Sequence, residues 1–221
     1  MSIQLHNELK KEFQIERLIL FSDAVFAIAI TLLVIEIKVP EIDSAQLSDA
    51  AIGKGLAHLI PRFVGFFISF LIIGIYWTVH HKVFVFVDNY TNKLLWLNLF
   101  FLFSIALMPF SSGLYGEYAN HIELLLPYGF YVFNICLTGL FNLLLWRYIS
   151  SPKSGISNQP ISNARRGYGN FRTLVVPFVF LISFVVAIWS PFISRYAPML
   201  LPLMMRLAAK YYKKKDPNIK Y

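Results

Sequence analysis

The chain has 221 residues, of which 57% are hydrophobic and only 14% are charged, and its formal net charge is +8. This composition is far more apolar than that of soluble domains and predicts an all-α, polytopic membrane protein. The positive charge is not typical of a nucleic-acid-binding protein, because the basic residues flank apolar segments and are not interleaved with aromatic residues on a soluble domain. We therefore expect no nucleic-acid partner.

Six apolar segments are candidates for membrane-spanning helices, which need roughly 20 residues each. They lie at about 18–37, 59–87, 94–114, 124–148, 171–192 and 196–212. The last segment is the weakest because it contains Pro198 and Pro202, and an interfacial helix is the alternative there. The whole chain is thus predicted to be a single six-helix transmembrane domain, with 213–221 as a basic cytoplasmic tail. Residues 1–16 are polar, so no signal peptide is expected, and they are compatible with a short amphipathic helix before the first span.

The distribution of basic residues predicts the topology. An even number of spans puts both termini on the same side of the membrane, and all but four of the 20 Lys and Arg residues fall on that side. The exceptions are Lys38, Lys54, Arg62 and Arg195. By the positive-inside rule, both termini are predicted to be cytoplasmic in a cell-membrane protein. The basic tail either binds anionic membrane lipid or only reports this topology.

The first span carries the most informative pattern. From residue 24 to residue 35 every residue is apolar except Thr31. Asp23 lies inside the span, where a carboxylate is costly, so we expect it to be paired and functional. At about 100° per residue, Asp23 lies about 140° from a stripe that is formed by Ile28, Leu32 and Ile35. From periodicity alone, such a stripe is expected to face lipid or to pack against other helices.

A motif at the start of this span resembles the TMEM175 family of potassium channels. The motif reads R-x-x-x-F-S-D and is formed by Arg17, Phe21, Ser22 and Asp23, followed by A-V-F-A-I-A-I-T-L-L-V. A second matching block is L-L-W-L-N-L at 94–99, with P-F at 109–110. The resemblance covers the helical core to about residue 150 well, and the rest only by helix count. It implies a potassium-selective cation channel without a cofactor, with the first helix lining a central pore.

The same resemblance implies roles for residues of the first span. The stripe Ile28, Leu32 and Ile35 is expected to face the pore as constriction and gate, with Thr31 and Glu36 as polar pore-lining residues. A constriction lined by side chains should select less sharply than a cage of carbonyl groups, so we expect a modest preference for K⁺ over Na⁺. Because the motif occurs once, one chain supplies one pore helix, and the resemblance implies a homotetramer.

Polar residues of the second and third spans need partners at membrane depth. They are Trp77, His80, His81 and Asn98. The simplest solution is one buried network that joins them to Arg17 and Asp23, and the resemblance implies that such a network anchors the four motif residues. The alternative is that both histidines lie at the cytoplasmic interface. Adjacent histidines on a helix point about 100° apart and cannot chelate one ion, so we expect no metal site.

Other functions are less well supported by the sequence. The G-Y-G at Gly167–Gly169 resembles part of a T-V-G-Y-G filter, but it lies in a basic loop, predicted to be irregular over 150–170, and is interpreted as a turn. No motif of an enzyme occurs. One alternative is a proton- or ion-coupled secondary transporter that uses Asp23, His80 and His81 as a relay, although no inverted repeat supports it. The other alternative is a non-conducting membrane scaffold.

Overall fold

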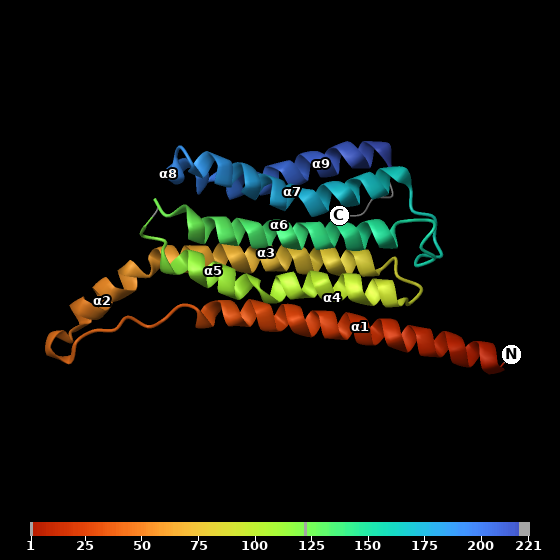
Figure 1. Ribbon diagram of the computed structural model, residues 1–221, viewed down its shortest axis with the longest axis horizontal. Helices are drawn as coiled ribbons and strands as arrows, with labels where there is room; N and C mark the ends of the chain where they lie inside the picture. Colours follow the sequence, from red (N-terminus) through yellow and green to blue (C-terminus); the bar gives the residue numbers. More distant parts are fainter. Residues whose placement is uncertain (1, 122, 217–221) are drawn as a thin grey trace.

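The computed structural model describes residues 2–121 and 123–216, with side chains from residue 11 onward; residues 217–221 of the predicted tail lie outside the described part. All regular secondary-structure elements in the described part of the chain are helices (Figure 1). In order, they are α1 (Ser2–Ile35), η1 (Ser44–Gln46), α2 (Asp49–His58), α3 (Ile60–Phe84), α4 (Asn92–Ala106), α5 (Met108–Glu117), α6 (Leu125–Ile149), α7 (Asn163–Ala187), α8 (Pro191–Ser194), η2 (Ala197–Leu200) and α9 (Leu201–Lys215).

The long helices lie side by side in one elongated bundle. Helices α3, α4, α5 and α6 form its middle, α1 lies along one edge, and α7 to α9 lie along the other (Figure 1). α1 packs on α3, α4 and α5, whereas α6 packs on α4 and α5 and on α7. The pore-helix candidate is therefore a peripheral element of the single chain.

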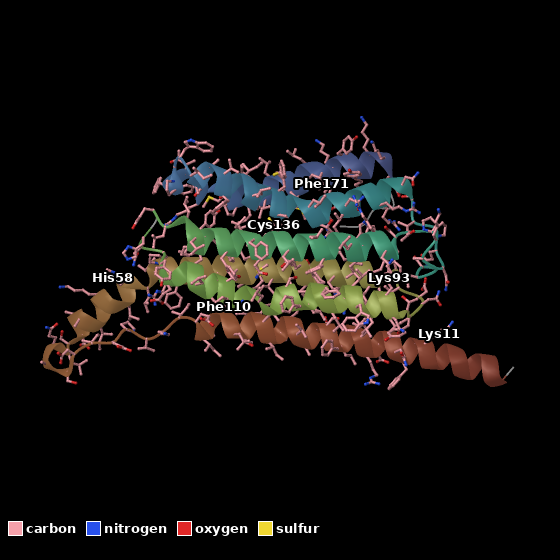
Figure 2. All side chains as sticks on the ribbon, in the orientation of Figure 1. Lys11, His58, Lys93, Phe110, Cys136 and Phe171 are labelled. Atoms are coloured by element: carbon pink, nitrogen blue, oxygen red, sulfur yellow. The ribbon has the colours of Figure 1, made fainter. Side chains whose placement is uncertain are left out.

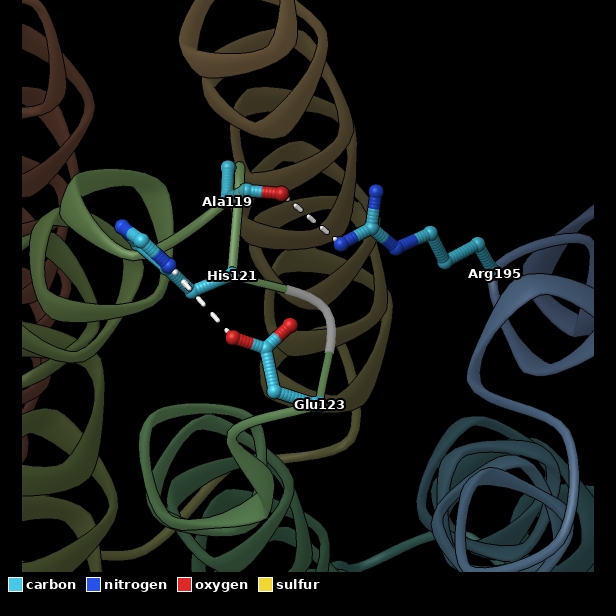
Figure 3. Close-up of polar contacts among 4 residues, drawn as sticks. All are labelled: Ala119, His121, Glu123 and Arg195. Atoms are coloured by element: carbon cyan, nitrogen blue, oxygen red, sulfur yellow. Dashed lines mark hydrogen bonds and ion pairs between the residues drawn. The ribbon is translucent and has the colours of Figure 1, made fainter.

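The ends of the bundle differ in what they carry. Figure 2 shows Lys11 and Lys93 at the end where the N-terminus lies, and His58 beyond the opposite end. At that opposite end, the Arg195 guanidinium donates to the carbonyl of Ala119 at 2.9 Å, and His121 lies 3.4 Å from Glu123 (Figure 3). The Arg195 bond ties the segment after α8 to the turn between α5 and α6.

Five helical segments in the described part of the chain are long and apolar enough to span a membrane: Lys11–Ile35, Ile60–Phe84, Asn92–Glu117, Leu125–Ile149 and Asn163–Ala187. They coincide with the first five predicted spans to within a few residues, apart from N-terminal extensions of the first and fifth. The largest is at α1, which begins at Ser2 as one continuous helix, so the polar N-terminal residues extend the first span.

The prediction of a sixth spanning helix at 196–212 is not confirmed. The chain instead forms two pieces over this range, η2 and α9, and a short helix, α8, precedes them; each of the three has a proline in its first turn. Proline lacks the backbone N–H that would continue the preceding helix, so Pro191, Pro198 and Pro202 divide the segment. The longest piece, α9, has 15 residues and is shorter than the roughly 20 that a span needs.

The broken segment still runs back along the whole of α7. Ser183, near the end of α7, donates to the carbonyl of Ser194 at 2.6 Å. Tyr212, near the end of α9, packs against Tyr168 in the first turns of α7, with ring centroids 5.5 Å apart. The chain thus returns to the end of the bundle from which α7 starts.

The third predicted span is also interrupted, at Leu107, where α4 ends and α5 begins. Pro109 is the cause, because it has no N–H for the carbonyl of Ile105 and its ring crowds that carbonyl. The interruption redirects the second half of the span, so that α5 packs on α1, α3 and α6.

The interpretation of Gly167–Gly169 as a turn in an irregular loop is wrong. α7 begins at Asn163, and the Ser162 hydroxyl caps it by accepting from the Arg165 N–H. The G-Y-G therefore lies within a helix. A Cβ on Gly169 would overlap the Trp146 side chain of α6, so this glycine permits the close approach of α6 and α7.

Candidate functional site

Helix α1 has two contrasting faces along its membrane-spanning half. One face is buried against the bundle through Ser22, Phe26, Ala29 and Leu33, which are at most 2% exposed. On the opposite face Ile28 is 58% exposed, Leu32 40% and Ile35 68%. Removing such an apolar face from water, into an assembly or into lipid, is favourable by a free energy of roughly 25 cal/mol per Å². The single chain leaves it uncovered.

The three stripe residues are brought together as predicted on one side of the helix. At about 1.5 Å per residue they occupy about 10 Å of helix axis between Ile28 and Ile35. Thr31 lies on the same exposed side and within this interval. The stripe is therefore a short apolar band with one hydroxyl in it.

The Thr31 hydroxyl is already used as a donor inside α1. Its Oγ1 lies 2.9 Å from the carbonyl of Ile28 and 3.1 Å from that of Ala27, which is the usual way a threonine satisfies its hydroxyl within a helix. Because the proton points to the backbone, the oxygen lone pairs are directed away from it. An oxygen so oriented can accept a hydrogen bond or act as a ligand for a cation.

Glu36 directly follows the last residue of α1, at the end of the bundle far from the N-terminus. Its side chain is exposed and lies against Gly113 of α5, where a Cβ would collide with its carboxylate. A small cleft there also includes Arg62, whose guanidinium is 3.0 Å from the Glu117 carboxylate. Glu36 thus adds negative charge just beyond the stripe.

A buried hydrogen-bond chain joins α1, α4 and α3. Asn98 donates to the Ser22 hydroxyl at 2.9 Å, and Ser22 donates to the carbonyl of Leu18 at 2.7 Å. His80 Nε2 lies 2.8 Å from Asn98 Oδ1, so the histidine is the donor in this pair. The His80 ring also packs on Phe84 and Phe101, at 4.2 and 5.6 Å between centroids. These contacts hold the inner face of α1.

Asp23 makes a second, separate connection from α1 to α3. The Trp77 Nε1–H donates to Asp23 Oδ1 at 2.9 Å. Hydrogen bonds to an ionised acceptor are roughly twice as strong as neutral ones, so this bond offsets part of the cost of a carboxylate at membrane depth. The sequence predicted that Asp23 needs a partner, and Trp77 is that partner.

The other predicted members of the network lie elsewhere. At about 100° per residue, Arg17 and Phe21 fall within about 20° of Ile28, on the exposed face of α1. Arg17 lies 5.8 Å from the Phe13 ring centroid, and Phe21 is 51% exposed. His81 is exposed, and its ring is 6.2 Å from that of Trp77. Only half of the motif, Ser22 and Asp23, contacts α3 and α4 in the hydrogen bonds of the described residues.

Taken together, the five apolar helices and the polar connections between them define a polytopic helical membrane protein with an uncovered apolar face on its first helix. Residues 17–109 match the family model described as the endosomal/lysosomal potassium channel TMEM175. This part of the chain is thus similar to the TMEM175 channels, as the motif in its first span predicts.

Two proteins of known sequence illustrate the range of relatives. A protein of Streptomyces collinus named as a potassium channel is 40% identical over an alignment of 111 residues, which covers 46% of this chain and 50% of that protein. A chicken protein named as the endosomal/lysosomal proton channel TMEM175 is 35% identical over an alignment of 118 residues, which covers 49% of this chain and 23% of that protein. The matched region therefore spans half, or less than half, of these relatives.

A solved structure extends the similarity over most of the chain. It is the crystal structure of a lysosomal potassium-selective channel TMEM175 homologue from Chamaesiphon minutus, which superposes with a TM-score of 0.73 at 25% identity. The superposition covers 88% of this chain and 97% of the other. The fold of this chain is therefore that of a TMEM175 homologue, including the region after residue 109.

Proposed function

We propose that this chain is the subunit of a potassium-permeable channel in the cell membrane, with a pore lined by α1 from each of four copies. The observation that carries the proposal is the division of α1 into a bonded inner face and an uncovered apolar face. Because α1 lies at the edge of the bundle, one chain encloses no pore, and a closed ring of copies is needed. The names of the bacterial relatives support K⁺ as the permeant ion.

In this proposal the stripe is both constriction and gate. Rings of Ile28, Leu32 and Ile35 offer no ligands, so an ion must pass them partly dehydrated, and a small displacement of α1 wets or dewets the constriction. A ring of Thr31 oxygens between them offers acceptors to the dehydrated cation. Glu36 at the mouth raises the local cation concentration. Side-chain oxygens on separate helices are less rigid than a carbonyl cage, so the preference for K⁺ over Na⁺ is modest.

The proposed topology places the N-terminal end of the bundle in the cytoplasm. Lys11 and Lys93 at that end fit the positive-inside rule (Figure 2). We infer that the broken segment 191–215 makes the sixth crossing along α7 and returns the C-terminal end to the cytoplasm. Broken helices occur at membrane depth where they are covered by protein, and α7 covers this one.

The function is tested by recording current from purified protein in a planar bilayer under a K⁺/Na⁺ gradient. The variant is Leu32→Ala, and its matched control is Leu181→Ala, the same truncation of an exposed leucine on α7. We expect an ohmic wild-type current reversing toward the K⁺ potential, a larger and less selective current for Leu32→Ala, and no change for Leu181→Ala. If Leu32→Ala has the same current and selectivity as the wild type, the pore does not lie along α1. Native mass spectrometry of the same preparation measures the number of copies.

A second candidate is proton conduction or proton-coupled transport, which the name of the chicken relative favours. Asp23 is half-buried and accepts a hydrogen bond from Trp77, which leaves its second carboxylate oxygen available for a proton on such a path. His80 is a poorer relay, because it is packed between aromatic rings and donates to Asn98. A pH gradient without K⁺ distinguishes the candidates: flux that saturates and is lost in Asp23→Asn supports transport, and silence in both assays supports a scaffold.

A further inference from the structure

A cavity lies at the N-terminal end of the bundle, away from α1. It has a volume of about 280 Å³ and is formed by the end of α6, the loop between α6 and α7, and the first turn of α7. Small-molecule sites begin at roughly 300 Å³, so the space suits a small ligand. Its polar lining residues are Ser150, Ser151, Ser157, Asn158, Gln159 and Arg166.

The wall of this cavity is fixed by hydrogen bonds to the turn between α3 and α4, which lies at the same end of the bundle (Figure 1). The backbone N–H groups of Asp88 and Asn89 both donate to the carbonyl of Ile156, at 2.9 and 3.0 Å. The Asp88 carboxylate accepts from the Asn158 N–H at 2.7 Å, and the Asn89 amide donates to the carbonyl of Gly155 at 2.8 Å. A loop held this way keeps the cavity open without a ligand.

Arg166 gives the cavity its charge. Its Nε is buried and has no hydrogen-bond partner among the described residues, although its carbonyl accepts from Trp146 Nε1 at 3.2 Å, which fixes the backbone. The lining contains no Asp or Glu. A guanidinium that is partly removed from water, in a lining whose other polar side chains are hydroxyls and amides, favours an anion. The same charge disfavours a cation, so this is not a second K⁺ site.

We propose that this cavity binds a phosphate group. A guanidinium donates two parallel hydrogen bonds to a phosphate, and serine hydroxyls and side-chain amides can satisfy its remaining oxygens. Two sources share this chemistry: the headgroup of an anionic lipid, which the cytoplasmic leaflet would present at this depth, and a soluble phosphate monoester. Occupancy would tie the end of α6 to the first turn of α7 through one ligand, within a loop that is already bonded to the turn between α3 and α4.

The test measures the thermal unfolding midpoint of the purified full chain. sn-Glycerol 3-phosphate is the soluble probe, with glycerol as its uncharged control. Phosphatidylcholine vesicles with and without phosphatidic acid are the lipid probe. A ligand that binds only the folded state raises the midpoint with concentration. We expect Arg166→Gln to raise the half-saturating concentration about tenfold or more, because a hydrogen bond to a charged group is lost. Lys153→Gln removes the same charge from an exposed residue of the same loop that does not line the cavity, and should change little.

Each outcome decides the matter. Stabilisation by glycerol 3-phosphate that Arg166→Gln abolishes supports a soluble source, and stabilisation by phosphatidic acid alone supports a lipid source. The proposal would be overturned if neither probe raised the unfolding midpoint. It would also be overturned if Arg166→Gln and Lys153→Gln reduced the stabilisation equally. If Arg166→Gln does not fold, Ser157→Asp and its neutral control Ser157→Asn replace it. The added negative charge should abolish binding, whereas the neutral amide should preserve it.

Discussion

The contribution of the α1 hydrogen-bond chain to the free energy of unfolding can be measured by making the same substitution at two buried asparagines. Asn98 is fully buried and makes two hydrogen bonds, to Ser22 and to His80. Asn142 on α6 is 1% exposed, and neither its Nδ2 nor its Oδ1 has a partner among the described residues. Leucine has the same branched arrangement of side-chain heavy atoms as asparagine, no polar atoms and a larger volume. Because the same substitution makes the same change in volume at both sites, the difference between the two variants reports the hydrogen bonds.

The expected effects have opposite signs. In Asn98→Leu, two bonds inside a membrane bundle are lost at about 0.6 kcal/mol each. The His80 N–H is also left without an acceptor, at a cost of about 1–3 kcal/mol, whereas Ser22 still donates to Leu18. The free energy of unfolding should thus fall by about 2–4 kcal/mol. In Asn142→Leu, removal of two unpaired polar atoms should raise it by about 1–3 kcal/mol.

The assay is equilibrium unfolding of both variants and the wild type in the same mixed micelles, followed by tryptophan fluorescence. Gel filtration of each folded variant checks that the oligomeric state is unchanged, so that subunit dissociation is not read as unfolding. If both variants destabilise the protein by the same amount, the bonds of Asn98 add nothing beyond those of any buried asparagine. Ser22, Asn98 and His80 would then not be the residues that position α1.

Three further variants test the stripe of α1, the contact of α1 with α3, and the packing of α6 on α7. Thr31→Val keeps the shape of the residue but removes its oxygen, so under a K⁺/Na⁺ gradient the reversal potential should move toward zero while assembly, measured by native mass spectrometry, is unchanged. Asp23→Ala removes the acceptor of Trp77 and should impair assembly or current; normal tetramers with normal current would contradict an anchoring role. Gly169→Val forces a side chain into Trp146 and should lower the free energy of unfolding by roughly 1–3 kcal/mol; an unchanged thermal midpoint would show that α6 and α7 separate freely.

The sequence predicted the five spans because hydropathy over some 20 residues is a strong, local signal. It failed where short-range chemistry overrides that signal. The first turns of α7 carry Arg165, Arg166 and Arg172, so hydropathy alone placed the start of the helix eight residues late. The sixth segment is apolar enough on average, but its prolines divide it into pieces that an average does not reveal.

The candidate site was predictable only in part, because which polar residues meet is a tertiary property. Helical periodicity correctly separated the stripe of Ile28 from Asp23, since that depends on one helix alone. The same periodicity places Arg17 and Phe21 near the stripe, but the resemblance of the whole motif suggested that its four residues act together. The structure divides them: Ser22 and Asp23 bond to α4 and α3, whereas Arg17 and Phe21 lie on the exposed face.

This division has a consequence for how the first helix could move. The bonds from Asn98 and Trp77 hold adjacent residues of α1, one turn before the stripe begins, and no side-chain hydrogen bond of the described residues ties the stretch from Phe26 to Leu33 to another helix. That stretch is held by apolar packing, which is non-directional and tolerates small sliding more readily than a hydrogen bond does. The bonded end therefore acts as a fixed point, and the stripe lies on the part of α1 that is freer to shift. A gate formed by Leu32 and its neighbours is consistent with this distribution of bonds.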